Sequence, residues 1–334
     1  MRRLRFELAA VPLLLLCATA GCGSAVQLNP RGSSLSGPRY ATSWISPDAK
    51  RTREILFESD LGYGSVEMFS LPKLKLEGVV TGFSAPGGMC SDTHGNVYVE
   101  NVQYPVETIE LSHEGKVLRT IGNFYATPVG CAVNPINDDL AVANIEDYNQ
   151  PASVWVFPNG ESGYGRWLRC SALTSYYYAG YDPQGHLFVD GGGSSGVALC
   201  RGADDNHTLT AVKVKHAKLN SPGMVQWYDP GKYLVLGDPR CSCIRRISIT
   251  GDTGRIIGST KLLDRHGKPL CNLVQGAIEP TAGMTLLGGD AAEGCGGTST
   301  VDEWPFPGGG VPPKYFGNPN FINEPAGTAV SIKS

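Results

Sequence analysis

Short apolar runs alternate with turn residues along most of the chain, and this alternation repeats. An acidic or amide residue closes one run and opens a turn at Asp92, Asn134, Asp182, Asp229 and Glu279, at intervals of 42, 48, 47 and 50 residues. Proline follows directly at the last four positions. Asx side chains bond their own backbone and proline presets φ, so these sites are predicted turns. Each turn leads into an apolar run typical of a buried strand, at 97–99, 140–142, 187–189, 233–236 and 284–287.

The two ends of the chain complement each other. Runs at 54–57, 65–69 and 77–80 supply a second, third and fourth strand, whereas 325–332 supplies a first strand with nothing after it. Joined, they complete a sixth sheet and close a ring, which leaves few exposed edges. An open β-solenoid or a two-sheet sandwich does not explain these ends. We therefore expect an all-β fold, a six-bladed β-propeller of four-stranded antiparallel blades over residues 51–334, closed by the C-terminal strand joining the N-terminal blade.

Composition agrees with many short strands. The chain has 43 Gly and 23 Pro but only 18% charged residues, a balance that suits turns and disfavours long surface helices. Length alone allows two domains, but all-β propellers of this size are often single units.

One repeat resembles the NHL-repeat type of propeller. The unit of that family runs Pro-x-Gly, apolar strand, Asp, Gly-Asn, apolar strand, Asp or Asn, apolar strand, Gly. The matching residues here are Pro86-Gly87-Gly88, Asp92, Gly95-Asn96, Asn101 and Gly122. The resemblance implies a propeller over nearly all of residues 53–334. Such repeats occur in binding modules and in enzymes, so the resemblance leaves function open.

The first 21 residues have the features of an export signal. Arginines near the start precede an apolar run at 11–16, and small residues follow it. The run is shorter than the roughly 20 residues that a membrane helix needs, which argues against a permanent span. Thr19-Ala20-Gly21-Cys22 resembles a bacterial lipoprotein signal, and this implies that Cys22 is lipidated and becomes the first mature residue. Ordinary cleavage and free secretion is the alternative.

Residues 22–50 are expected to form a flexible tether, because Ser, Gly, Pro and Asn dominate this segment and few apolar residues are available for burial. The predicted location is the bacterial cell envelope, on the periplasmic or outer-membrane side. Removing residues 1–21 changes the formal charge from −3 to about −5 and leaves no basic stripe. Nucleic acid is therefore not an expected partner, and we expect a monomer.

Eight of the 10 cysteines remain once Cys17 leaves with the signal and Cys22 is assigned to the lipid. An even number in an oxidising compartment predicts disulfides, although eight thiols allow 105 pairings. Cys90 and Cys131 occupy matching places in successive repeats and are the predicted pair. Cys241-Ser242-Cys243 is interpreted as a further disulfide. A metal or redox pair is the alternative, without a CxxC spacing or a nearby histidine to support it.

Asp or Asn stands at the end of each second strand, at Asp60, Asn101, Asn144, Asp190, Asp238 and Asp290. These ends share a face with the blade-to-blade loops, so the side chains are expected to ring one mouth, although Asx residues also cap such turns structurally. The loops of that face carry Tyr104, Tyr125, Tyr148 and Tyr177. Aromatic rings among amides suit a carbohydrate, peptide or protein ligand. Gln226 and Gln275 fall in first strands and are expected to line the central channel.

The sequence contains no GxSxG elbow, HExxH helix, phosphate loop or EF-hand spacing. We therefore predict a binding or scaffold module with no catalytic residue, metal or cofactor. The alternative is an enzyme resembling the calcium-dependent lactonases and sugar-acid hydrolases, which use similar propellers. That resemblance implies calcium as the cofactor and Glu100, Asn144 and Asp238 as candidate ligands.

Overall fold

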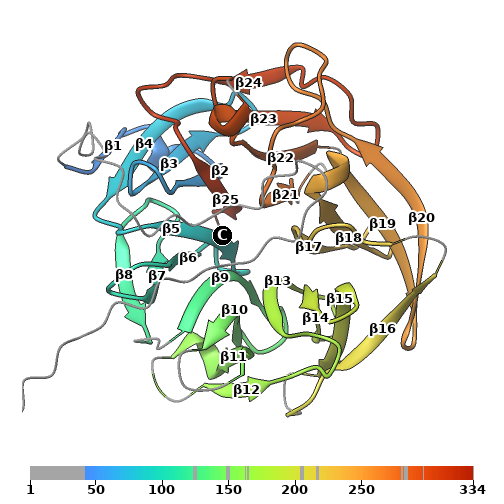
Figure 1. Ribbon diagram of the computed structural model, residues 1–334. Coiled ribbons are helices and arrows are strands. Elements are labelled where there is room, and N and C mark those ends of the chain that lie inside the picture. Colours follow the sequence, from blue (N-terminus) through green and yellow to red (C-terminus); the bar gives the residue numbers. More distant parts are fainter. Residues whose placement is uncertain are drawn as a thin grey trace, which may run out of the picture. The chain divides into compact units, whose positions relative to one another are not determined.

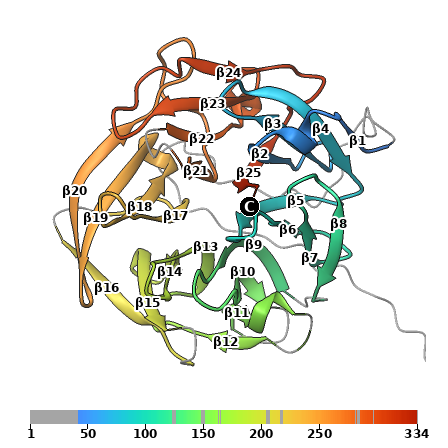
Figure 2. The same ribbon diagram turned by 180° about the vertical axis from the view of Figure 1, so that it is seen from behind.

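The computed structural model describes residues 42–333, apart from 123–125, 148–150, 162, 164, 204–206, 216–217, 280, 282–284 and 296. Within these residues the chain forms six four-stranded antiparallel blades around a common centre (Figure 1). The reverse view shows the same ring, with the first strand of each blade nearest the centre (Figure 2). The predicted all-β propeller of six blades is confirmed.

Blades A, B and C contain the strands of the first half of the propeller, and blade A also contains the last strand of the chain. From the centre outward, blade A holds β25 (Pro325–Ile332), β2 (Glu54–Asp60), β3 (Ser65–Ser70) and β4 (Lys75–Thr81). Blade B holds β5 (Pro86–Ser91), β6 (Val97–Asn101), β7 (Glu107–Leu111) and β8 (Val117–Ile121). Blade C holds β9 (Ala126–Val133), β10 (Leu140–Asp147), β11 (Val154–Phe157) and β12 (Arg166–Leu168).

The other three blades follow in chain order. Blade D holds β13 (Ser175–Tyr181), β14 (His186–Gly193), β15 (Gly196–Ala203) and β16 (Thr210–Lys215). Blade E holds β17 (Val225–Tyr228), β18 (Tyr233–Asp238), β19 (Cys243–Thr250) and β20 (Thr253–Lys261). Blade F holds β21 (Gly276–Ile278), β22 (Thr285–Asp290), β23 (Thr300–Pro305) and β24 (Lys314–Phe316). Blades D and E share one eight-stranded sheet, because the outer strands β16 and β20 pair in parallel.

The ring closes where the two ends of the propeller pair. β25 runs antiparallel to β2 along its length, so the last strand becomes the innermost strand of the first blade. His113 of blade B adds a side-chain link at this closure. Its Nδ1 lies 2.7 Å from Ser331 Oγ, and its Nε2 lies 2.9 Å from the carbonyl oxygen of Thr52. The predicted closure of the ring by the C-terminal strand is confirmed.

Blade A also has a fifth strand at its outer edge. β1 (Trp44–Ile45) pairs with β4, and the 3₁₀ helix η1 (Ala49–Arg51) after it buries Ala49 completely. The propeller therefore begins before residue 51, within the segment assigned to the tether. The predicted signal, Cys22 and the tether up to residue 41 lie outside the described residues. In the part of the chain that is described, no helix is long and apolar enough to cross a membrane.

The hydrophobic core is divided into layers between neighbouring blades. Val97 and Val99 of β6 pack with blade A, whereas Tyr98 between them packs with blade C. Among the described residues one such cluster lies at each junction of the ring. Both faces of a second strand are thus buried, which explains why these strands read as continuous apolar runs.

The turns from first to second strand have the chemistry that the repeat predicts. Asp92 Oδ1 accepts hydrogen bonds from the backbone amides of His94 and Asn96 at 2.9 and 2.7 Å. Asp182 Oδ1 accepts the equivalent pair, from the backbone amides of Gln184 and His186, two repeats further on. Each carboxylate stabilises a tight turn, so these connections from first to second strand are short.

Candidate binding face

Two kinds of loop emerge on the other side of the ring, which we call the entry face. They are the loops from second to third strands and the loops that enter each blade, and both reach this side because strands within a blade alternate in direction. The first kind includes 61–64, 102–106, 194–195, 239–242 and 291–299, and the second includes 82–85, 169–174, 262–275 and 317–324. The two longest of these ranges are 262–275, which leads from blade E into blade F, and 291–299 within blade F.

The six Asx residues predicted to ring this face are buried beneath it, each at most 2% exposed. Asp60 shows the common contact, since its Oδ2 accepts hydrogen bonds from the backbone amides of Asn323 and Glu324 at 2.6 and 3.2 Å. The other acceptor pairs join Asn101 to Ser84 and Ala85, Asp190 to Gly223, Asp238 to Asn220, and Asp290 to Cys271 and Asn272. Asn144 instead donates to the carbonyl oxygens of Val142 and Ser153.

These contacts correct the expectation of a polar ring that is open at the mouth. Backbone amides of the blade-entry loops would be unpaired under the surface, and the Asx side chains supply their acceptors. Burial raises the pKa of Asp190 to about 8 and that of Asp60 to about 6, although backbone hydrogen bonds to each carboxylate act in the opposite direction. Five of the six Asx residues, all except Asn144, therefore hold entry loops from below.

The predicted tyrosines differ in accessibility. Tyr104 is 88% exposed, and Ser84 Oγ donates a 2.9 Å hydrogen bond to its carbonyl oxygen. Tyr177 is half-buried beside Tyr178, with ring centroids 6.4 Å apart. Tyr125 and Tyr148 lie outside the described residues. Of the two that are described, Tyr104 is the ring open to a ligand.

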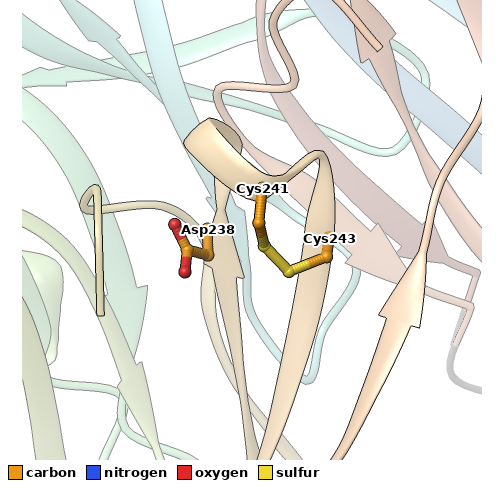
Figure 3. Close-up of side chains that lie close together, drawn as sticks. All are labelled: Asp238, Cys241 and Cys243. Atoms are coloured by element: carbon orange, nitrogen blue, oxygen red, sulfur yellow. A yellow bond between two sulfur atoms is a disulfide. The ribbon is translucent and has the colours of Figure 1, made fainter. Parts of the chain in front are cut away.

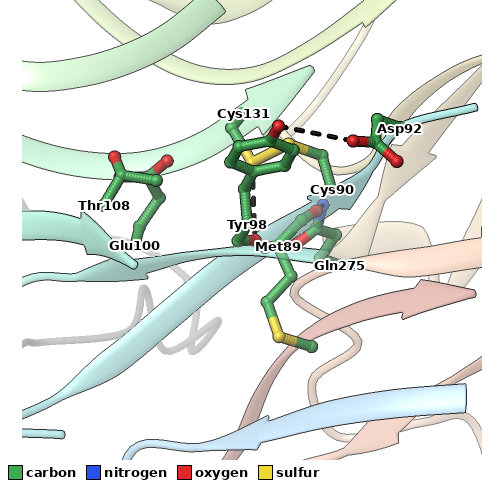
Figure 4. Close-up of a disulfide and its surroundings, with 8 residues drawn as sticks. All are labelled: Met89, Cys90, Asp92, Tyr98, Glu100, Thr108, Cys131 and Gln275. Atoms are coloured by element: carbon green, nitrogen blue, oxygen red, sulfur yellow. Dashed lines mark hydrogen bonds between the residues drawn. A yellow bond between two sulfur atoms is a disulfide. The ribbon is translucent and has the colours of Figure 1, made fainter. Parts of the chain in front are cut away.

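Gln226 lies in β17 as predicted, whereas Gln275 directly precedes β21, and each connects its blade to another blade. The side-chain amide of Gln275 bridges from blade F to Met89 of blade B, accepting from its N–H at 2.8 Å and donating to its carbonyl oxygen at 2.7 Å (Figure 4). Gln226 makes the same double contact with Ile278, at 2.8 and 3.4 Å. Both amides have backbone partners, so at the centre of the ring these residues tie blades together.

Glycines bring adjacent inner strands into backbone contact near the centre. A Cβ at Gly88 would overlap the carbonyl oxygen of Val129, and one at Gly130 would lie 2.5 Å from that of Tyr177. The pattern recurs at Gly180 against Val225 and at Gly327 against Gly87. No side chain separates the strands at these positions, since only glycine permits so close an approach.

Four disulfides are present in the described residues. Cys90–Cys131 joins β5 to β9, the innermost strands of blades B and C, with the ring of Tyr98 beside it (Figure 4). This is the pair that matching repeat positions select. Cys170–Cys200 and Cys241–Cys243 are also joined, and Cys271–Cys295 ties two long loops of the entry face. This set of disulfides indicates an extracytoplasmic protein.

Asp238 lies beside the disulfide Cys241–Cys243 at the entry end of blade E (Figure 3). A carboxylate oxygen and the two sulfur atoms all lie within 4.8 Å of one another. Asp238 Oδ2 accepts from Asn220 Nδ2 at 2.8 Å and from Arg245 Nε at 3.4 Å, while Oδ1 is buried without a hydrogen-bond partner. A cavity of about 10 Å³ borders Asp238 and Cys243, with room for at most one water.

Sequence analysis missed this juxtaposition, although a signal was present. The 3₁₀ helix η3 (Pro239–Cys241) follows Asp238 directly, and a 3₁₀ turn brings residues i and i+3 together. Asp238-Pro239-Arg240-Cys241 therefore predicts a carboxylate next to the first cysteine. Neither a histidine nor a CxxC spacing marks this arrangement in the sequence.

Comparison with known proteins shows the fold. No family model matches the sequence, and no curated protein matches it either. Among solved structures, a chain of a nidogen/laminin complex is similar with a TM-score of 0.66 and 13% identity, over 84% of this chain and 99% of that one. A protein of unknown function from Bacteroides caccae gives 0.63 and 11% over 84% and 99%, and Kuenenia stuttgartiensis hydrazine synthase gives 0.54 and 14% over 84% and 80%.

Proposed function

We propose that the protein is an exported binding propeller of the bacterial cell envelope, anchored by a lipid on Cys22. Its entry face takes a carbohydrate, peptide or protein ligand. The construction of that face supports this function most: long loops are held from below by buried Asx residues and linked by Cys271–Cys295, and Tyr104 is exposed among them. Loops fixed before binding lose little conformational entropy when a ligand binds.

Two further observations are consistent with binding. The nidogen propeller comes from a complex with laminin, so a fold of this kind also occurs in a protein-binding assembly. The segment 86–122 fits the NHL unit in sequence and forms one complete blade in the structure, which supports the NHL type of repeat.

A photo-crosslinking amino acid at position 104 tests the entry face in the native envelope. The matched control is the same residue at Ile136, which is 64% exposed on the opposite face. We expect adducts from position 104 and few from position 136. Equal adducts from both positions, or none from position 104, would contradict binding at the entry face.

The anchor has a separate test. Cys22→Ser is expected to release the processed protein from the membrane fraction, because lipidation requires the cysteine thiol. If the variant stays membrane-associated and is processed normally, the lipid anchor is wrong, while the binding face is unaffected.

Calcium-dependent hydrolysis is a second candidate, and one observation favours it. Glu100, Asn144 and Asp238 each retain a fully buried side-chain oxygen without a hydrogen-bond partner. Hard cations take several such oxygens. Terbium luminescence or calorimetry with Ca²⁺ tests the site. Saturable binding lost in Glu100→Gln, together with chelator-sensitive cleavage of a lactone, would establish the enzyme, and absence of both would exclude it.

A further inference from the structure

The disulfide Cys241–Cys243 combines three features outside the proposed binding role. It links residues only two positions apart, so it connects no separate parts of the fold. Cys241 is partly exposed at the entry face, whereas Cys243 is 6% exposed. The buried carboxylate of Asp238 lies within 4.8 Å of both sulfur atoms, and one of its oxygens is unpartnered.

We propose that Cys241 and Cys243 form a reversible thiol–disulfide exchange site, in which Asp238 transfers the proton of Cys243. The substrates are external thiols and disulfides of low molecular weight, of which glutathione is a suitable probe. The proposal does not depend on the binding function of the entry face.

Exposure decides the order of the reaction. An external thiolate attacks Cys241 Sγ; the new S–S bond forms as the Cys241–Cys243 bond breaks, and the electron pair passes to Cys243 Sγ, which is then protonated. A second external thiolate attacks the sulfur of the first external thiol in the mixed disulfide, and Cys241 leaves as a thiolate that is protonated by solvent. The protein disulfide is reduced to two thiols, and two external thiols are oxidised to one disulfide.

Asp238 acts on the buried sulfur in both directions. In the reverse reaction the Cys243 thiol must lose its proton before it can attack a mixed disulfide on Cys241, because the thiolate is the nucleophile. The carboxylate lies within 4.8 Å of the sulfur and its Oδ1 has no hydrogen-bond partner, so it is the available acceptor through one water in the adjoining cavity. Arg245 and Asn220 hold the other oxygen, which fixes the carboxylate in place.

The backbone keeps the two sulfurs together after reduction. Ser242 has a left-handed φ of 50°, its Oγ donates to the Leu270 carbonyl oxygen at 3.0 Å, and its own carbonyl oxygen accepts from Leu262 N at 2.9 Å. These contacts hold the residue between the cysteines whether or not the sulfurs are bonded. The pair can therefore reoxidise to the same disulfide.

The test follows exchange with glutathione in the folded, full chain by alkylation and mass spectrometry. Trypsin isolates the pair, since Arg240 and Arg245 flank it. Cys271–Cys295 is the internal control. It has an exposed cysteine, Cys295, but among the described residues it does not form a close group of one carboxylate and two sulfur atoms as Cys241–Cys243 does with Asp238. We expect Cys241–Cys243 to exchange at least about tenfold faster than Cys271–Cys295. Equal or slower exchange overturns the proposal, and this comparison needs no variant.

Asp238→Asn separates the proton transfer from the fold. It keeps an oxygen for Asn220, and we expect at least a tenfold slower reoxidation at neutral pH, with the difference shrinking as pH rises and the thiolate forms unaided. Asp302→Asn removes the charge of another buried carboxylate with one unpartnered oxygen, in β23 of blade F, and is expected to leave the rate unchanged. Equal rates for Asp238→Asn and the unaltered protein across the pH range would rule out the role of Asp238.

Discussion

The disulfides Cys90–Cys131 and Cys241–Cys243 show two uses of the same bond. The first joins the inner strands of two blades, spans 41 residues and has Cys131 at 2% exposure. The second links η3 to the first residue of β19, two positions apart at the entry face, and leaves Cys241 partly exposed. Loop-closure entropy assigns about 4 kcal/mol of stabilisation to the first and roughly 1 kcal/mol to the second. The difference indicates that stability explains the first bond but not the second.

Removing each disulfide in turn compares their contributions to stability. The largest effect is expected for the bond between blades B and C. Cys90→Ser together with Cys131→Ser is expected to lower the free energy of unfolding by about 4 kcal/mol, because the unfolded chain regains its freedom. Urea denaturation measures this. A loss below about 1 kcal/mol would show that the interblade layer alone holds blades B and C together.

Glu100 lies close to the first disulfide and makes this region sensitive to pH (Figure 4). Burial raises the pKa of Glu100 to about 8. The hydrogen bond that Thr108 Oγ1 donates to its carboxylate at 2.8 Å acts in the opposite direction and lowers the pKa. The raised pKa favours the folded state below the pKa of the unfolded chain, near 4.5, and this stabilisation is lost as pH rises towards 8.

Glu100→Gln should remove that pH dependence. At pH 8 the variant is expected to be more stable than the unaltered protein by roughly 2–4 kcal/mol, and at pH 4 the two should be nearly equal. Thermal unfolding from pH 4 to 9 measures the difference. Glu161→Gln, at an exposed site, is the control and should follow the unaltered protein. Parallel curves for Glu100→Gln and the control would contradict a protonated Glu100.

The double contact between Gln275 and Met89 gives a smaller effect in the same region. Gln275→Ala leaves the backbone groups of Met89 without these partners, and the expected loss of stability is about 1–3 kcal/mol. Gln103→Ala, at an exposed loop position, should change stability by less than about 0.5 kcal/mol. A neutral Gln275→Ala would mean that water replaces the amide.

The smallest effect is expected at the loop disulfide. Cys241→Ser with Cys243→Ser should lower the free energy of unfolding by roughly 1 kcal/mol or less. Thermal unfolding of this double variant beside the Cys90/Cys131 double variant completes the comparison. A loss as large as that of the blade junction would give both bonds the same structural role.

The fold was predictable because it rests on local and periodic features. Turn residues at repeat intervals, apolar second strands and complementary ends predicted the six blades and their closure. The same periodicity brought Cys90 and Cys131 to matching positions. His113 escaped this reasoning, because its partners Ser331 and Thr52 meet it only once the ring has closed.

The candidate site was less predictable. The Asx positions were found from sequence. Asp and Asn can serve either as exposed ligand contacts or as buried acceptors for backbone amides, so residue type does not distinguish the two roles. Which of these applies depends on where the blade-entry loop passes, as the contact between Asp60 and residues 323–324 shows. Likewise, Gln275 belongs to blade F, and its partner Met89 lies in blade B.

The sequence by itself determined the number of blades, the turn chemistry and the strand that closes the ring, because each follows from a local pattern repeated along the chain. Only the tertiary structure decided which polar groups are available for chemistry. Blade-entry loops supply partners to the Asx side chains and other blades supply partners to the Gln side chains, whereas Asp238 keeps one free oxygen beside two sulfurs. Burial and pairing are properties of the packed ring, so no single repeat encodes them.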